Sequence, residues 1–277
     1  MDPVTISRLL DSIEAFVYKN QMSKLEFQHH LRLTPRRCGE LLRTLSEMQL
    51  VALEDEMAKA TKNFTLLVEC WEKADLSCIN TIFKECSPYA RFLKYLEEVQ
   101  VIKLPHGDSI EEVKANKTEL SKQLKKNVGL NFVAFDNLQS WAIALGVAHR
   151  SENSIVWGGN QPSRIRFREA LLEKYEELRG ATGYAQVGLL ADEICVKLRM
   201  SIPTFREYFR RFYEDNWQSI LTSGAVEWAP SRRYVLRFLS KLGSPLRFWT
   251  WSVEDGFDVR KDNVKLIKVV QPCWTKM

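Results

Sequence analysis

Residues Met200–Leu221, MSIPTFREYFRRFYEDNWQSIL, have the clearest helical pattern in the sequence. Its aromatic residues recur close to the helical period: Phe205, Phe209, Phe212 and Trp217. This spacing predicts one helix that buries a wide apolar stripe. Ser201 can cap the start of that helix, and Pro203 suits its first turn because the missing N–H costs nothing there.

A second short amphipathic helix is predicted just upstream, over residues 189–198, with an Arg-Met-Ser turn between the two helices. Two short helices joined by a tight turn form a helix-turn-helix pattern. Arg206, Arg210 and Arg211 lie off the apolar stripe of the second helix. The second helix of the pair is therefore basic.

The same theme occurs in the first sixty residues. Helices are predicted over residues 5–19 and 23–31, and a third begins at Thr34-Pro35, where a capping residue precedes a proline. The apolar run Leu50–Leu53 then indicates a strand. The residues that follow, MAKATKNF, indicate a short turn rather than a hairpin, so this unit shows no clear wing.

A further copy lies between these two. Helices are predicted over residues 109–127 and 132–145, and the β-branched residues of 147–158 predict a hairpin after them, with its turn at residues 152–154. A helix that leads into a hairpin is the wing arrangement, and this is its clearest occurrence. Residues 64–99 are predicted to be helical and to form a connector packed on the first unit.

The last third continues the pattern. Ser163 caps a predicted helix at 164–179, and a later helix is predicted at 231–242. Strands are predicted at three places, with Asp-Gly and Asp-Asn turns between them: 246–253, 257–260 and 264–270. Small sheets are thus expected after residues 50, 147 and 246.

The predicted fold class is mainly α with small β-hairpins, arranged as three units. Residues 1–104 would hold the first unit and the helical connector. Residues 105–160 would form the middle unit, and residues 161–277 a basic third unit with a small sheet.

This pattern resembles the winged helix-turn-helix superfamily. Three segments carry the resemblance: LTPRRCGELLRTLSEMQLVAL (33–53), NFVAFDNLQSWAIALGVAHRSENSIVWGG (131–159) and MSIPTFREYFRRFYEDNWQSIL (200–221). The resemblance implies tandem winged-helix modules joined by a helical connector. Such modules often bind DNA with the third helix in the major groove and a basic wing on the backbone, whereas others only dock proteins. Fold alone does not choose between these functions.

The net charge of +5 is uneven along the 277 residues. Residues 1–104 carry −1, residues 105–160 are neutral, and residues 161–277 carry +6. The last third is therefore the best candidate for contact with a polyanion. The alternative is that this charge serves only solubility.

Several classes of function lack their sequence signals. The chain contains no phosphate-binding glycine loop, no H-E-x-x-H and no G-x-S-x-G, so we expect no enzyme activity and no cofactor. The cysteines form no C-x-x-C pair, so we expect Cys70, Cys78 and Cys86 to be reduced and buried, with no metal bound. No apolar run approaches the roughly 18 residues of a membrane span, and no secretory signal is evident. A cytoplasmic location without a membrane partner is expected.

The third helices of the three units differ in charge. In the first, Arg36, Glu40, Arg43 and Glu47 form one stripe whose pairs would neutralise each other, while Arg37 stays free. In the second, the only charge is Asp136, so that helix is expected to face protein. In the third, Glu207 can pair with Arg211 and Arg210 with Glu214, but Arg206 has no acidic residue four positions away on either side.

Two functions fit these observations. The first is a non-enzymatic DNA-binding protein, either a regulator or the DNA-contacting subunit of a larger complex. The expected contacts to duplex DNA are Arg206, Arg210, Arg211, Arg232, Arg233, Arg37 and Arg150. The second is a winged-helix scaffold or adaptor that docks proteins without touching DNA. A protein partner or a homodimer is compatible with both functions. His149, beside Arg150 at the wing, is expected to be exposed and without a role.

Overall fold

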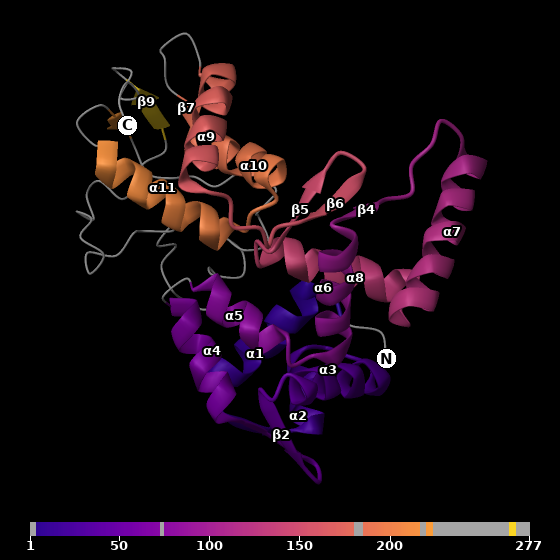
Figure 1. Cartoon of the computed structure of the whole chain (residues 1–277). Helices are drawn as coiled ribbons and strands as arrows, with labels where there is room; N and C mark the ends of the chain where they lie inside the picture. Colours follow the sequence, from indigo (N-terminus) through magenta and orange to yellow (C-terminus); the bar gives the residue numbers. More distant parts are fainter. Residues whose placement is uncertain (1–3, 73–74, 180–184, 217–219, 224–265, 270–277) are drawn as a thin grey trace.

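The computed structural model describes residues 4–72, 75–179, 185–216, 220–223 and 266–269 (Figure 1). In these ranges the chain is mainly helical, with three small antiparallel sheets of three strands each. The prediction of a mainly α fold with small β-hairpins is confirmed at this level. No helix in the described ranges is long and apolar enough to cross a bilayer.

One order of elements occurs three times: helix, strand, helix, helix, strand, strand. The first unit contains α1 (Ile6–Tyr18), β1 (Gln21–Ser23), α2 (Lys24–His30), α3 (Pro35–Glu47), β2 (Val51–Glu54) and β3 (Met57–Ala60). The middle unit contains α6 (Ser87–Val99), β4 (Val101–Lys103), α7 (Ile110–Val128), α8 (Phe132–Ala144), β5 (Ala148–Ser151) and β6 (Ser154–Trp157). The third unit contains α9 (Arg164–Leu178), β7 (Ala185–Gln186), α10 (Val187–Leu198), α11 (Ile202–Asn216), β8 (Ile220–Ser223) and β9 (Leu266–Val269). Helices α4 (Lys62–Glu72) and α5 (Leu76–Phe83) join the first unit to the middle unit.

The three sheets share one strand order, in which the last strand of the unit lies in the centre. The orders are β1-β3-β2, β4-β6-β5 and β7-β9-β8, and every pair is antiparallel. Figure 1 shows the middle unit between the other two, with the indigo first unit on one side and the orange third unit on the other. Repetition of both element order and strand order makes each unit a copy of one arrangement.

The expected boundary between residues 104 and 105 needs correction. β4 pairs with β6, with Val101 opposite Val156 and Lys103 opposite Ser154, and α6 packs on both strands. Residues 87–103 therefore belong to the middle unit, and only α4 and α5 connect. A three-residue strand has too short a pattern for its partner to be predicted locally.

The first unit also has a β-hairpin that the sequence did not indicate. Residues 57–60, Met-Ala-Lys-Ala, form β3, which pairs with β2 on one side and β1 on the other. These residues have weak strand preference, but Ala58 is fully buried and both edges of β3 are paired. Tertiary pairing therefore outweighs local preference here.

The helix starts follow the cap residues in the sequence. Thr34 accepts a hydrogen bond from the backbone of Arg37 before α3, and Pro35 occupies the first helical position. Ser163 and Ser201 cap α9 and α11 in the same way. At α7, the C-terminal stop is Gly129, whose φ of 71° suits a residue without a side chain.

A buried tryptophan joins the first and middle units. Trp141 of α8 is fully buried, and its indole N–H donates to the carbonyl of Val4 at 3.0 Å. Its ring lies 5.4 Å from the ring of Phe83 and 5.6 Å from that of Tyr89, centroid to centroid. The predicted burial of Trp141, Leu45 and Phe209 is confirmed.

The turn between α10 and α11 docks on the middle unit. The N–H of Ile202 donates to the carbonyl of Gly146 at 3.0 Å, and the N–H of Asn160 donates to the carbonyl of Arg199 at 2.8 Å. His149 donates its Nε2–H to the carbonyl of Met200 at 2.8 Å. His149 is buried, so the expectation that it is exposed is wrong.

The cysteine prediction is partly wrong. Cys70 at the end of α4 is disulfide-bonded to Cys78 in α5, with their Cα atoms 6.0 Å apart. Cys86 is a buried free thiol as expected, and burial raises its pKa to about 11. No cluster of metal-binding side chains occurs among the described residues.

The predicted helix at 231–242 and the strands at 246–253 and 257–260 lie outside the described residues.

Replacing Gly146 by alanine should lower the free energy of unfolding by at least about 1 kcal/mol. Gly146 has a φ of +67°, which costs an L-residue roughly 1–2 kcal/mol. An added Cβ would also lie 2.9 Å from the Cβ of Ile202. The measurement is denaturant unfolding followed by circular dichroism.

Gly39→Ala is the matched control for this experiment. Gly39 lies within α3, and an added Cβ there has no heavy atom within 4 Å. This substitution should raise the free energy of unfolding by roughly 0.5–1 kcal/mol, because alanine is the better helix former. Equal stability of Gly146→Ala and wild type would show that the third unit does not dock in this way.

Candidate nucleic-acid interface

The third helix of each unit is covered to a different degree. In α11 the first turn lies against the middle unit, where Met200 and Ile202 are 0% and 1% exposed. Arg206, Arg210 and Arg211 are half-buried, and Arg211 forms the predicted ion pair with Glu207. The end of α11 that would enter a DNA groove is therefore occupied by contacts within the chain.

Helix α8 faces protein, as its lack of charge predicts. More than half of its residues are buried, and Trp141 anchors it to the first unit. Asp136 is exposed and accepts a hydrogen bond from the buried Gln139 at 2.6 Å. The helix presents no basic side chain to solvent.

Helix α3 leaves its charged face open to solvent. The side chains of Arg36 and Arg37 are 87% and 68% exposed, and Arg43 one to two turns later is also exposed. Together with Arg8 of α1 they line a hollow of about 830 Å³, which we call the α3 hollow. The N-terminal part of α8 forms its far wall through Val133 and Asn137.

The ion pairs in the α3 hollow differ from the predicted ones. Glu40 accepts from Arg36 at 3.1 Å, as expected, but also from Arg37 at 2.6 Å, so Arg37 is not free. The predicted pair of Arg43 with Glu47 is absent: within the described chain neither Arg43 nor Arg8 forms an ion pair. Four arginines and one carboxylate thus line the α3 hollow, and two of the arginines pair with that carboxylate.

The two arginine partners of Glu40 change the pKa of its carboxyl group. Partial burial would raise the pKa of Glu40, but hydrogen bonds from Arg37 and Arg36 outweigh that effect and lower it overall. Glu40 therefore stays ionised, and the α3 hollow carries a net positive charge. The exposed N-terminus of α3 adds a partial positive charge, because its first N–H groups lack helical acceptors.

The β2–β3 hairpin of the first unit has the opposite charge. Its tip contains Glu54 at the end of β2 and Asp55 and Glu56 in the turn, of which only Glu56 approaches a cation, 3.5 Å from Lys24. Three carboxylates at this tip would repel phosphate. A polyanion that contacts α3 must therefore lie toward α1 and α8, away from this hairpin.

The remaining predicted contacts are less favourable or undescribed. Arg150 is exposed on β5, but it lines a hollow with Asp136, Asp192 and Glu193. Arg232 and Arg233 lie outside the described residues. Of the predicted contacts, Arg37 thus lies in the α3 hollow, together with arginines that were not predicted as contacts. Arg150 and the arginines of α11 lie outside this hollow.

Arg8, Arg36 and Arg43 line this surface but were not predicted from the sequence as DNA contacts; Arg36 and Arg43 were expected on a stripe that neutralises itself. The helical period of α1 predicts that Arg8 lies off the apolar stripe and is exposed. It does not predict that Arg8 lies near α3, because that depends on tertiary packing. Comparison with known proteins adds no assignment, since no family model, curated protein or solved structure matches the chain. The geometry of the site is therefore the main basis for function.

Removing its arginine partners should raise the pKa of Glu40 toward its ordinary value. The hydrogen bonds from Arg36 and Arg37 favour the ionised carboxylate, so the Arg36→Ala, Arg37→Ala double variant should titrate at higher pH than wild type. The measurement is an NMR pH titration of the glutamate side-chain carbons. Arg32→Ala, outside the α3 hollow, should leave the titration unchanged; identical pKa values in all three proteins would rule out these bonds.

Proposed function

We propose that this chain is a tandem winged-helix protein without enzymatic activity that binds duplex DNA through the α3 hollow. It would serve as a regulator or as the DNA-contacting subunit of a larger complex. The observation that carries the proposal is that four arginines and a single glutamate line a hollow beside the open third helix of the first unit. Arg8 and Arg43 have no ion pair in the described chain, so their charge is available to phosphate.

The arrangement of the units supports the winged-helix interpretation. Each unit has three helices and a three-stranded antiparallel sheet that includes a short strand after the first helix, and in the first and middle units the last two strands form a hairpin. In helix-turn-helix proteins the N-terminal residues of the recognition helix contact base edges in the major groove. Of the three third helices, α3 has an N-terminal turn that is both exposed and basic, with Pro35, Arg36 and Arg37 facing solvent.

The chemistry of arginine suits this surface to nucleic acid. Guanidinium groups make bidentate contacts with phosphate and with the O6 and N7 atoms of guanine. Each phosphate contact releases condensed counterions, so affinity falls with salt at a log–log slope of roughly −0.9 per contact. Glu40 competes for two of the arginines, which limits the affinity of one chain and favours use together with a partner or a second copy.

The second candidate is a scaffold that docks proteins without DNA. The observation in its favour is that α8 and the first turn of α11 are already used for contacts between units. A unit of this type therefore makes protein contacts readily in this chain. A scaffold of this kind would not need the α3 hollow with its excess of arginine, so this hollow favours DNA binding over the scaffold.

The Arg8→Ala, Arg43→Ala double variant should bind duplex DNA more weakly than wild type, with a shallower salt dependence. The slope should fall by about 0.9 for each DNA phosphate that the variant no longer binds. Fluorescence anisotropy with a labelled duplex at several salt concentrations measures both quantities. Glu40→Gln should bind more tightly than wild type, because it removes the carboxylate that competes for Arg36 and Arg37.

Two further variants define the controls. Lys84→Ala, Lys94→Ala removes the same charge from exposed positions outside the hollow and should leave affinity nearly unchanged. Arg206→Ala, Arg210→Ala should also bind as wild type; a decrease in affinity confined to this variant would move the interface to α11. Failure of the wild-type chain to bind duplex DNA at low salt would contradict the proposal and favour the scaffold.

A further inference from the structure

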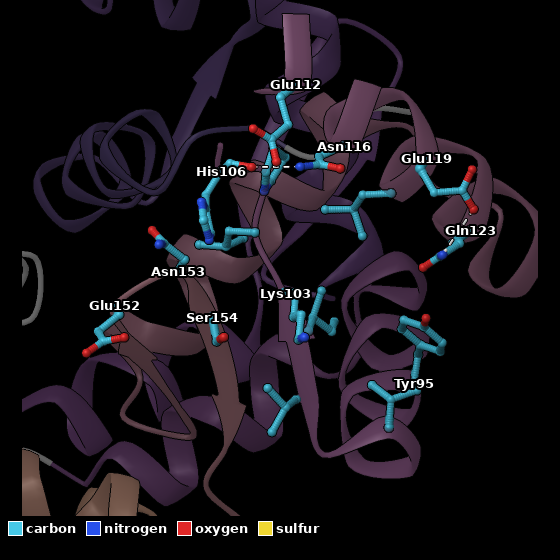
Figure 2. Close-up of a pocket in the computed structure, with 16 residues that line it drawn as sticks. Tyr95, Lys103, His106, Glu112, Asn116, Glu119, Gln123, Glu152, Asn153 and Ser154 are labelled. Carbon is cyan, nitrogen blue, oxygen red and sulfur yellow. Dashed lines mark hydrogen bonds between the residues drawn. The ribbon is translucent and has the colours of Figure 1, made fainter. Parts of the chain in front are cut away.

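A groove lies between β4 and α7 in the middle unit (Figure 2). It has a volume of about 770 Å³, within the range of binding pockets. Its apolar lining residues come from α6, from β4 and the residues directly after it, and from α7: Tyr95, Val99, Val101, Ile102, Leu104, Pro105 and Leu120. In Figure 2, Glu119 and Gln123 of α7 lie on one side of Lys103, and Glu152 of the β5–β6 turn and Ser154 of β6 lie on the other.

One wall of the groove is the open edge of a sheet. β4 is an outer strand whose one neighbour is β6. The N–H of Leu104 donates to Asn153 and the carbonyl of Gln100 accepts from Trp157, so Ile102 is the hydrogen-bonded residue between them. Because bonded residues alternate along an antiparallel pair, the N–H and C=O groups of Val101 and Lys103 point away from β6.

These outward groups have no partner in the described chain. No described residue forms a backbone or side-chain hydrogen bond with the N–H or C=O of Val101 or Lys103. Both residues line the groove. The edge can therefore accept an added strand, a common mode of peptide recognition in which backbone groups supply the pairing.

The opposite wall is a polar stripe on α7. Glu112, Asn116, Glu119 and Gln123 follow one another at spacings of four, three and four, which places them on one face of the helix. The buried residues of α7 are Leu120, Leu124 and Val128, all in its C-terminal half. The first half of α7 thus stands apart from the sheet instead of packing on it, as Figure 1 shows.

The charge of the groove is negative. Glu112, Glu119 and Glu152 line it, against the one cation Lys103. None of these three carboxylates forms an ion pair within the described residues. A polyanion is disfavoured here, which separates this surface from the α3 hollow, and a basic ligand is favoured by charge complementarity.

We infer that the groove binds a basic, extended segment of a partner protein, which adds to β4 as a fourth strand of the middle sheet. The partner's backbone pairs with Val101 and Lys103, and its lysine or arginine side chains reach Glu119 and Glu112. Pro105 has no N–H, so pairing is limited to about three residues and the side-chain contacts add affinity. Self-pairing of two β4 edges is disfavoured, because it would bring two negatively charged grooves together.

Amide hydrogen exchange with a defined probe tests this inference. The probe is the peptide Lys-Val-Lys-Val-Lys-Val, acetylated and amidated, added to the full ¹⁵N-labelled chain. The amides of Val101 and Lys103 should exchange more slowly with peptide present, whereas that of Ile102, already bonded to β6, should not change. The same peptide with alternate backbone nitrogens methylated keeps its charge but cannot pair, and it should give no protection.

Two variants make the outcome decisive. Val101→Pro removes an outward N–H that β6 does not use, and it should weaken peptide binding about fivefold to tenfold, the value of roughly one hydrogen bond. Glu119→Lys should also weaken binding, whereas Glu98→Lys, the same change on α6 outside the groove, should not. No protection at millimolar peptide, equal protection by the methylated peptide, or a chain that is already a dimer through β4 would overturn the inference.

Discussion

The lack of a side chain at Gly146 governs which surfaces of the molecule are open. Gly146 ends the helical segment at α8 in a left-handed conformation, and the backbone of Ile202 approaches closely enough to donate a hydrogen bond to its carbonyl. Any Cβ at this position would meet Ile202. The contact seats the turn before α11 on the middle unit, so α11 has no free end there. Of the three equivalent helices in the described chain, α3 is the one left with an exposed, basic start.

Local signals predict the elements of this fold better than their contacts. The capped starts at Thr34, Ser163 and Ser201 and the stop at Gly129 lie where their sequences indicate, because capping involves residues within one turn. The pairing of β4 with β6 was not predictable, since it joins residues some fifty positions apart through a strand of three. Such strand pairings depend on tertiary packing, and a single sequence contains no local pattern that predicts which strands pair.

The same limit applies to the site residues. Spacing along α3 predicts the pair of Arg36 with Glu40 correctly, but it pairs Arg43 with Glu47, and in the structure Arg43 lines a hollow with Arg8 of another helix. The sequence predicts an exposed wing residue at His149, yet the carbonyl of Met200, fifty-one positions later, holds it in the interior. The sequence thus shows which residues are basic. Which of them lie together depends on which helices pack side by side, and the sequence does not show this. The basic hollow belongs to the first unit and the acidic groove to the middle unit, so the two surfaces do not compete for one ligand.

The hydrogen bond from Trp141 to the carbonyl of Val4 has a consequence for synthesis of the chain. The two residues are 137 positions apart, and ribosomes add roughly 5–20 residues per second. Tyr89, which packs against Trp141, precedes it by 52 positions, so several seconds pass between the addition of these two residues to the chain. During that interval Val4, Phe83 and Tyr89 are on the nascent chain without the tryptophan that covers them. Chaperones that bind apolar segments would therefore find their target on this protein before translation reaches α8, and lose it afterwards.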